Sequence, residues 1–258
     1  MQQQDLPAAD AADSTVDPAE VAKFSKLSDE WWNPNGKMAP LHKINPLRLG
    51  YIRDAACRKF DRNAKSLSCL SGLRILDIGC GAGLLCEPLT RLGAQVIGVD
   101  PSASNIAAAK LHADKGHLSI DYRCTTVEQM DVRERFDIVL AMEVVEHVTD
   151  IGAFLSRCAA MLKPGGMMVV STLNRNWKSF ALAIVGAEYI LRWLPRGTHQ
   201  WEKFVTPDEL AQYLLQNKLV VTEETGVVYS PFADRWSLSA DTDVNYMVVA
   251  EWAAEVAG

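Results

Sequence analysis

A glycine-rich stretch, residues 75–83, carries the clearest chemical signal in the sequence. It reads ILDIGCGAG, so three glycines at alternate positions follow an apolar run that ends at Asp77. Glycines at this spacing let the backbone turn tightly and leave room for a ligand against the main chain. A second apolar run, residues 95–99, leads into Asp100, where an acid can accept hydrogen bonds from a ribose diol. The stretch therefore indicates a site for a ligand that contains a ribose.

The glycine spacing separates the classes of nucleotide-like ligand. A dinucleotide fingerprint needs G-x-G-x-x-G, but its third glycine would fall at Leu84 or Cys86 in the two possible registers. A P-loop is excluded because no Gly-Lys-Ser/Thr follows the glycines. The pattern D-x-G-x-G-x-G resembles instead the motif of the S-adenosylmethionine (SAM) methyltransferases. We therefore predict SAM as the cofactor, with Asp77, Gly79, Gly81 and Asp100 in its site.

A second reactive group, Glu143, Glu146 and His147, follows an expected strand at 136–141. Strand ends of this kind line the ligand crevice of open α/β sheets. Methyl transfer to oxygen needs aligned reactants and an acceptor that has lost its proton. Two roles remain open: His147 could act as the general base, with Glu143 beside it, or all three side chains could hold Mg²⁺ and lower the pKa of a catechol hydroxyl.

The predicted elements alternate along the middle of the chain. Expected strands at 73–77, 95–99, 120–123, 136–141 and 166–171 are interleaved with expected helices at 83–92, 102–114 and 150–162. This alternation predicts an α/β fold, a mostly parallel sheet with helices on both faces. Earlier helices are expected at 18–29 and at 47–60, the latter with Pro46 in its first turn.

The end of the chain departs from this alternation. A capping box at Thr206 and Glu209 predicts a helix at 207–217. Two β-rich runs follow at 219–228 and 244–251, and they would complete a seven-stranded sheet with one antiparallel strand.

The interval 174–204 is too long for an ordinary loop in a compact domain. Its apolar stretch is too short to span a bilayer. It could be a lid helix packed on the core, or a helix that lies in a membrane interface. The aromatic and basic residues that flank the stretch favour the interface: Trp177, Arg192, Trp193, Arg196 and Lys203.

Composition narrows the remaining possibilities. The 258 residues are 48% hydrophobic and carry a net charge of −6, which argues against nucleic acid as a partner. The six cysteines include no C-x-x-C pair, so they indicate buried thiols in a reducing compartment rather than a zinc site. We expect residues 1–20 to form a disordered acidic tail on a cytoplasmic, bacterial protein, followed by one domain at 21–258 that begins with helices at 21–70.

Four segments taken together resemble the ubiquinone-biosynthesis O-methyltransferases, which are class I SAM-dependent methyltransferases with a Rossmann-like fold. They are PLHKINPLRLGYI at 40–52, the glycine loop, MEVVEH at 142–147 and STLNRN at 171–176. The resemblance spans residues 21 to 258.

This resemblance implies methylation of phenolic hydroxyls on polyprenylated catechol-type intermediates, at both O-methylation steps of the ubiquinone pathway. It also implies that the cofactor contacts Arg48, Gly79, Asp100 and Met142, with Arg48 on the methionyl carboxylate. Further implications are a divalent ion, Mg²⁺, on Glu143, Glu146 and His147, peripheral membrane contact through 174–204, and partners among other ubiquinone-biosynthesis proteins. Two alternatives remain: a methyltransferase for another small molecule, and a non-catalytic binding protein with the same fold.

Overall fold

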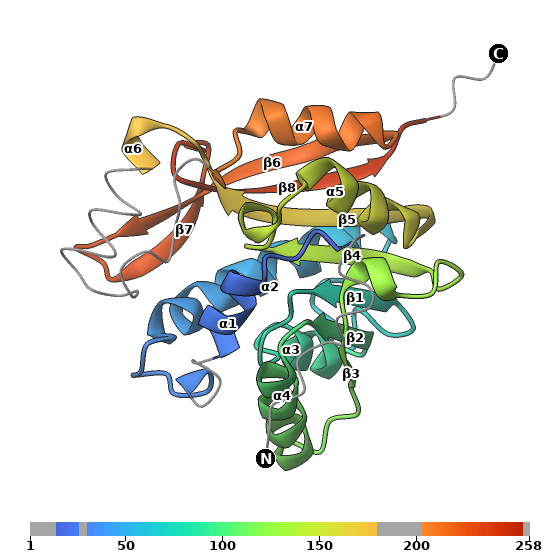
Figure 1. Cartoon of the computed structure of the whole chain (residues 1–258), viewed down its shortest axis with the longest axis vertical. Helices are drawn as coiled ribbons and strands as arrows, with labels where there is room; N and C mark the ends of the chain where they lie inside the picture. The colour runs from blue at the N-terminus through green and yellow to red at the C-terminus, as the bar shows by residue number, and fades with distance from the viewer. Residues whose placement is uncertain (1–13, 26–29, 180–202, 255–258) are drawn as a thin grey trace.

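The computed structural model describes residues 14–25, 30–179 and 203–254, and one eight-stranded sheet runs through it (Figure 1). The strand order is β3-β2-β1-β4-β5-β8-β6-β7. In chain order the strands are β1 (Arg74–Ile78), β2 (Gln95–Asp100), β3 (Asp121–Cys124), β4 (Phe136–Met142), β5 (Leu162–Leu173), β6 (Leu219–Ser230), β7 (Arg235–Ser239) and β8 (Asn245–Trp252).

The predicted α/β fold is confirmed, but the strand count was one too low. β1 to β5 pair in parallel, and β8 is antiparallel to both of its neighbours, β5 and β6. The eighth strand, β7, forms an antiparallel hairpin with β6 at the edge of the sheet, so two strands rather than one run against the rest. The five residues of β7, RWSLS, alternate polar and apolar side chains, but the sequence signal is weak because the run is short and contains only two apolar residues.

Helices cover both faces of the sheet and create two cores. They are α1 (Pro18–Ser25), α2 (Ala39–Lys59), α3 (Cys86–Arg91), α4 (Ala103–Lys115), α5 (Ile151–Ala160), α6 (Trp177–Ser179) and α7 (Pro207–Gln216). Successive strand residues point to opposite faces. Ile75 thus packs in the core formed with α2, α3 and α4, while Leu76 packs in the core formed with α5 and α7.

Two N-terminal predictions need correction. Helix α2 begins at Ala39, so Pro46 lies inside the helix rather than in its first turn, and Pro40 occupies the start instead. A proline inside a helix removes one backbone hydrogen bond but does not stop a helix that packs on a core. The expected tail also ends earlier than residue 20: Val16 forms an antiparallel bridge with Val148, and α1 begins at Pro18. Residues 1–13 lie outside the described residues.

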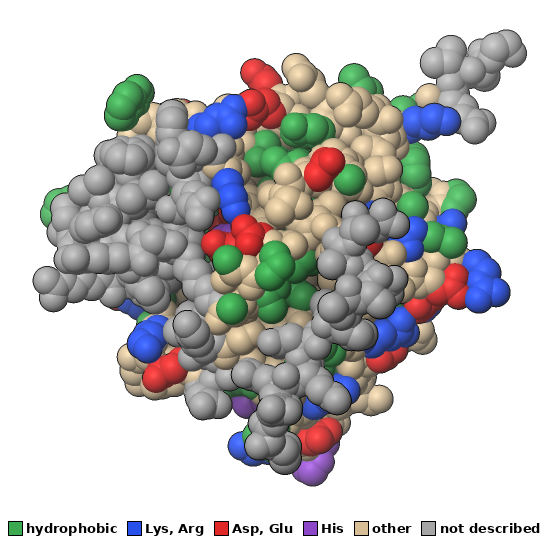
Figure 2. All heavy atoms as spheres, in the orientation of Figure 1, with side chains coloured by type: hydrophobic (Ala, Val, Ile, Leu, Met, Phe, Trp, Pro, Cys, Tyr) green, Lys and Arg blue, Asp and Glu red, His purple; other side chains and the backbone are tan. Residues whose placement is uncertain are grey.

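The interval 174–204 is described only at its two ends. Residues 180–202 lie outside the described part of the chain, so Arg192, Trp193 and Arg196 do as well. Within the described ranges, none of the helices has the length and apolar character needed to cross a membrane. The face shown in Figure 2 carries lysine and arginine side chains scattered among acidic ones.

Candidate active site

The carboxyl ends of the three central strands open into one cavity. Ile78 of β1 pairs with Val99 of β2 and with Ala141 of β4, so the residues that follow emerge side by side. The cavity there has a volume of about 970 Å³, within the size range of ligand sites. All nine site residues predicted from the sequence line it: Arg48, Asp77, Gly79, Gly81, Asp100, Met142, Glu143, Glu146 and His147.

The glycine loop is fixed to the end of β2 by backbone hydrogen bonds. The amides of Gly79 and Cys80 both donate to the carbonyl of Val99, at 2.8 and 3.1 Å. Gly79 and Gly81 have φ values of +68° and +53°, a region that side chains rarely tolerate. A Cβ on Gly79 would lie 2.6 Å from the Val144 side chain, and one on Gly81 would lie 2.5 Å from the Trp31 ring. Both positions therefore require glycine.

Asp100 accepts a hydrogen bond from the glycine loop and is also the predicted acceptor for the ribose. Its Oδ2 accepts the amide of Gly81 at 3.0 Å, and its Oδ1 accepts the amide of Ser102 at 2.9 Å and the side chain of Asn105 at 3.3 Å. Burial raises the pKa of Asp100, and the amides of Ser102 and Gly81 oppose that rise. Carboxylate oxygens have two lone pairs each, so one lone pair on Oδ2 remains to accept a ribose hydroxyl.

Asp77 is a second buried acid on the cofactor side. It is 3% exposed, and the thiol of Cys86 donates to its Oδ2 at 3.1 Å. Burial raises the pKa of Asp77 to about 7, and the charge of Asp100 adds to the rise. The Cys86 hydrogen bond and the Arg48 charge act in the opposite direction.

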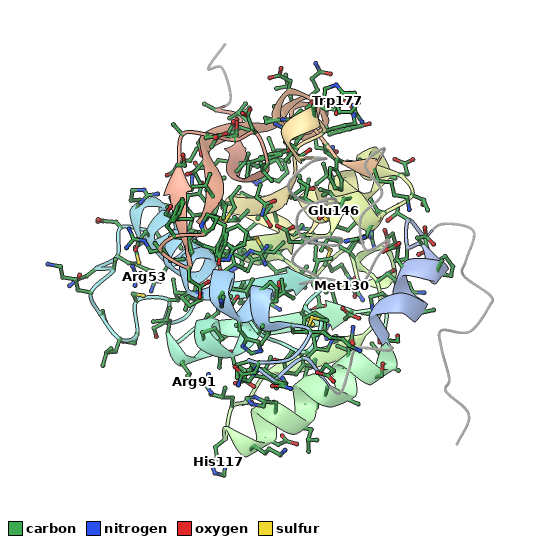
Figure 3. The ribbon with its side chains drawn as sticks, turned by 90° about the vertical axis from the view of Figure 1, so that its left-hand side faces the viewer. Arg53, Arg91, His117, Met130, Glu146 and Trp177 are labelled. Atoms are coloured by element: carbon green, nitrogen blue, oxygen red, sulfur yellow. The ribbon has the colours of Figure 1, made fainter. Side chains whose placement is uncertain are left out.

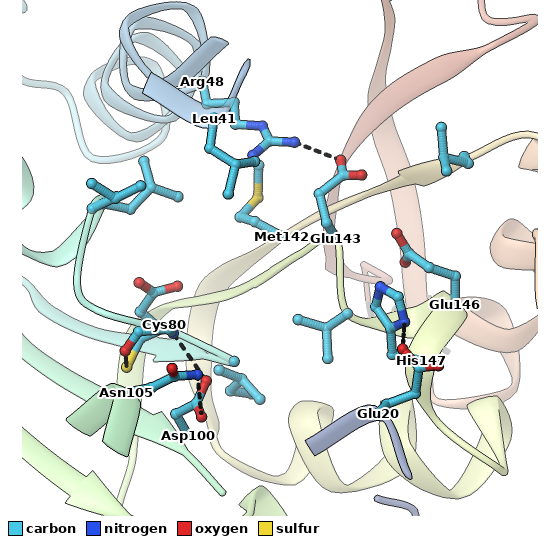
Figure 4. Close-up of a pocket in the computed structure, with 18 of the residues that line it drawn as sticks. Glu20, Leu41, Arg48, Cys80, Asp100, Asn105, Met142, Glu143, Glu146 and His147 are labelled. Carbon is cyan, nitrogen blue, oxygen red and sulfur yellow. Dashed lines mark hydrogen bonds and ion pairs between the residues drawn. The ribbon is translucent and has the colours of Figure 1, made fainter. Parts of the chain in front are cut away.

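Arg48 extends from α2 to the boundary between the two halves of the cavity. Its Nη2 lies 2.7 Å from Oε1 of Glu143 (Figure 4). The Ser171 hydroxyl also donates to this Oε1, at 2.9 Å. Glu143 has a φ of +57°, a strained conformation that such contacts must hold in place. Glu143 is therefore engaged as a counter-ion and is not placed as an unpaired base.

Glu146 lies in the interior of the molecule (Figure 3) and is 3% exposed. Its Oε2 accepts the hydroxyl of Thr172 at 2.9 Å. Its Oε1 is also buried, and within the described residues it has no hydrogen-bond partner. Burial raises the pKa of Glu146 to about 7, and the nearby charge of Glu143 raises it further. Such a carboxyl can take up or release a proton near neutral pH.

His147 is held by a residue that the sequence analysis missed. Its Nδ1 lies 2.9 Å from Oε2 of Glu20, which reaches it from α1 (Figure 4). Glu20 is 9% exposed. The sequence reading assigned residues 1–20 to a tail, and a single acid in an Ala- and Asp-rich segment carries no signal of a long-range partner.

The side chains of the predicted magnesium ligands, Glu143, Glu146 and His147, do not form a metal site in the described residues. Among the residues described, no group of three or more His, Cys, Asp or Glu side chains is arranged to hold a metal ion. Glu143 faces Arg48, and His147 faces Glu20. The described arrangement therefore does not fit a resident ion.

Comparison with known proteins agrees with this geometry. A family model described as "Methyltransferase domain" matches residues 49–224. The ubiquinone biosynthesis O-methyltransferase of Bradyrhizobium sp. (strain ORS 278) is 87% identical over 92% of this chain and 94% of its own length. The enzyme of that description from Rhodopseudomonas palustris (strain BisB18) is 81% identical over 95% of this chain and 96% of its own. The chain belongs to the ubiquinone biosynthesis O-methyltransferase family. Members of this family are SAM-dependent enzymes, and the predicted family and cofactor are confirmed.

Solved structures confirm the fold of this O-methyltransferase. The magnesium protoporphyrin IX methyltransferase of Synechocystis PCC 6803 with bound SAH superposes with a TM-score of 0.65 at 16% identity, covering 90% of this chain and 95% of that one. The plantazolicin methyltransferase BpumL gives a TM-score of 0.60 at 17% identity, covering 91% and 97%. At these identities the likeness establishes the class I methyltransferase fold.

We predict that Asp100→Ala weakens SAM binding by roughly tenfold or more, because a charge-assisted hydrogen bond is worth about 1.5–3 kcal/mol. Calorimetric titration with SAM measures the change. Asp121→Ala, which removes an acid from β3 outside the cavity, is the matched control. Equal affinities for the two variants would contradict the ribose assignment of Asp100.

Asp77 makes a pH-dependent contribution to stability. Its folded-state pKa of about 7 lies above the ordinary value of 3.8, so the folded chain keeps this proton while the unfolded chain loses it. Stability therefore falls as pH rises from about 4 to 7. We expect Asp77→Asn to raise the melting temperature by a few degrees at pH 8 and to change it little at pH 4.5. Scanning calorimetry at the two pH values measures the change in melting temperature. Asp114→Asn, at an exposed position of α4, is the control. An increase in melting temperature of the same size at pH 8 and at pH 4.5 would rule out the titration of Asp77 as its cause.

Proposed function

We propose that this chain transfers the methyl group of SAM to a phenolic hydroxyl of polyprenylated catechol-type intermediates, at both O-methylation steps of ubiquinone biosynthesis. The observation that carries the proposal is that one cavity contains both the glycine loop with Asp100 and the group of Glu146 and His147. A methyl donor and its acceptor must meet within one water-poor space. The relatives at 79–87% identity are ubiquinone biosynthesis O-methyltransferases, and this supports the assignment of the pathway.

The cofactor would occupy the half of the cavity at the ends of β1 and β2. Asp100 would accept a ribose hydroxyl on its Oδ2, and the tight turn that Gly79 and Gly81 allow would place the backbone of the glycine loop beside the cofactor. Arg48 would pair with the methionyl carboxylate. Met142, at the end of β4, would lie against the body of the cofactor, at the border with the acceptor half.

The half of the cavity that would hold the phenol would also contain the group that accepts its proton. The phenolic proton would pass to Oε1 of Glu146 or to the imidazole of His147, since both residues line the cavity. SAM, when bound, would supply the methyl group: the phenolate oxygen would form a bond to the methyl carbon, and the electron pair of the broken carbon–sulfur bond would stay on sulfur. The products are the methyl ether and S-adenosylhomocysteine. No further oxidant or reductant is needed.

Apolar residues suit the remainder of the acceptor. The β6–β7 hairpin and α2 pack against each other, and both contribute apolar residues to the lining of the cavity. Their lining residues are Leu41, Ile44, Val227, Val228, Tyr229 and Trp236. An aromatic ring with a prenyl chain would bury its surface against such a wall.

The direct test is methylation of a prenylated catechol, detected by mass spectrometry, with an unprenylated polar catechol in parallel. We expect the prenylated compound to be the better substrate. His147→Ala and Glu146→Gln should each lower kcat by roughly a hundredfold or more, the usual contribution of a general base, while SAM affinity stays nearly unchanged. Equal rates on both catechols would favour a methyltransferase for another small molecule.

The same assay tests the magnesium prediction, which rests on the family resemblance and not on the described geometry. Reactions with added Mg²⁺ and with EDTA are compared. Equal rates would exclude a metal requirement, and loss of activity in EDTA would mean that Glu143, Glu146 and His147 rearrange to bind an ion.

We further propose that the enzyme associates peripherally with membranes, in which its prenylated substrate resides, and that residues 174–204 make this contact. Trp177, at this segment's N-terminal side, is 79% exposed and projects from the edge of the molecule (Figure 3). An exposed indole suits the headgroup region. Contact with other ubiquinone-biosynthesis proteins remains a prediction from the same resemblance.

Co-sedimentation with anionic liposomes tests the membrane contact. We expect Trp177→Ala to reduce binding and deletion of residues 181–191 to abolish most of it, because both changes remove apolar area from the interface. Leu67→Ala, at a position that is 88% exposed elsewhere on the molecule, is the matched control. Unchanged sedimentation of the deletion variant would assign the membrane contact to another surface.

A further inference from the structure

The Arg48–Glu143 ion pair joins the two halves of the cavity. Arg48 comes from α2, and Glu143 directly follows β4. Arg48 acts electrostatically on Asp77 at the cofactor end, while its Nη2 lies 2.7 Å from Glu143, the first residue of the acid–imidazole group (Figure 4). Arg48 thus lines the same cavity as Asp77 on the cofactor side and Glu143 on the acceptor side.

A buried guanidinium needs a counter-charge. The Arg48 side chain is 8% exposed, and it is the one lysine or arginine among the described residues that is buried. An unpaired buried cation would be strongly destabilising, since its lost hydration would not be replaced. Glu143 supplies the negative charge in this structure, although its own side chain is 23% exposed and its backbone is strained.

The methionyl carboxylate of SAM has the same charge and the same hydrogen-bonding geometry as the Glu143 carboxylate. We infer that Glu143 is a displaceable counter-ion of Arg48: it occupies the guanidinium before the cofactor binds, and the cofactor carboxylate takes that place. The inference rests on the proposed role of Arg48 in the cofactor site. Glu143 is then a positioning residue, because it acts on the cofactor through Arg48.

The displaced Glu143 stays near the acceptor. The Ser171 hydroxyl donates to its Oε1 at 2.9 Å, and its backbone amide donates to the Ser171 carbonyl at 3.0 Å. These contacts come from β5 and do not involve Arg48. A Glu143 carboxylate released from the guanidinium therefore becomes available to a hydroxyl of the incoming phenol. Cofactor binding completes the acceptor site, so the cofactor binds first and the phenol second.

The competition predicts an unusual result for a residue that lines the site: removing its charge should improve binding. Glu143→Gln keeps the size of the side chain but competes poorly for Arg48. We expect it to bind SAM and S-adenosylhomocysteine roughly fivefold more tightly than the wild type, at the lower end of typical coupling between sites. Isothermal titration calorimetry on the full chain measures both affinities, and a melting curve confirms that the variant folds.

Three controls isolate the ion pair. Methylthioadenosine, which lacks the carboxylate, should bind the wild type and Glu143→Gln equally well. Glu146→Gln removes a neighbouring acid that does not contact Arg48, so it should leave SAM affinity unchanged. In an Arg48→Met background, Glu143→Gln should lose its effect, since the two residues act through a single contact.

The outcomes distinguish this inference from the proposed function. If the wild type fails to bind SAM at all, the cofactor site itself is wrong. If SAM binds and Glu143→Gln binds it equally or more weakly, the cofactor site stands and the competition is overturned. A gain for methylthioadenosine equal to that for SAM would also overturn it, because that ligand carries no carboxylate to compete.

Discussion

The parallel register of β1, β2 and β4 is the constraint on which the rest of the site depends. Ile78 pairs with Val99 and with Ala141, so Gly79, Asp100 and Met142 leave their strands at the same edge. Backbone hydrogen bonds hold this register, and a slip by one residue would turn every strand side chain to the opposite face. Because each strand is packed on two cores, such a slip would expose both of them. The same pairing that stabilises the sheet therefore sets the positions of the ligand-facing residues.

The charges around the cavity are unevenly distributed. Burial raises the pKa values of Asp77, Asp100 and Glu146, so folding works against ionising three acids in one region. Arg48 is the buried cation that offsets them in the described part of the chain. A sulfonium brings a further positive charge to this environment. The fold thus carries an electrostatic cost that binding of a cationic cofactor relieves.

Sequence patterns predicted the parts of this site that depend on local backbone chemistry. Gly79 and Gly81 have positive φ, Asp100 is the last residue of β2, and Asp77 is the last but one of β1, so all four carry a local signal. The helix start at Thr206 was equally clear, because its capping box forms as expected.

The features that sequence reasoning missed depend on long-range packing. The Glu20–His147 contact joins residues between which four of the eight strands lie in the chain. The Arg48–Glu143 pair gives both partners a role that neither motif indicates. Pro46 suggested a helix start, but packing of α2 on the sheet carries the helix through it. β7 became a strand through pairing with β6 and not through its own composition.

The N-terminal segment, residues 14–25, crosses from one half of the cavity to the other. Thr149 donates its amide and its hydroxyl to the Thr15 carbonyl beside the acceptor group, while the Ser25 hydroxyl lies 2.7 Å from that of Ser102, next to Asp100. The matched methyltransferase domain begins only at residue 49. The part of the chain shared across methyltransferases thus contains the glycine loop, whereas one wall of the cavity is encoded ahead of it. Substitutions in this short leading segment would therefore change the lining of the cavity without altering the sequence of the glycine loop.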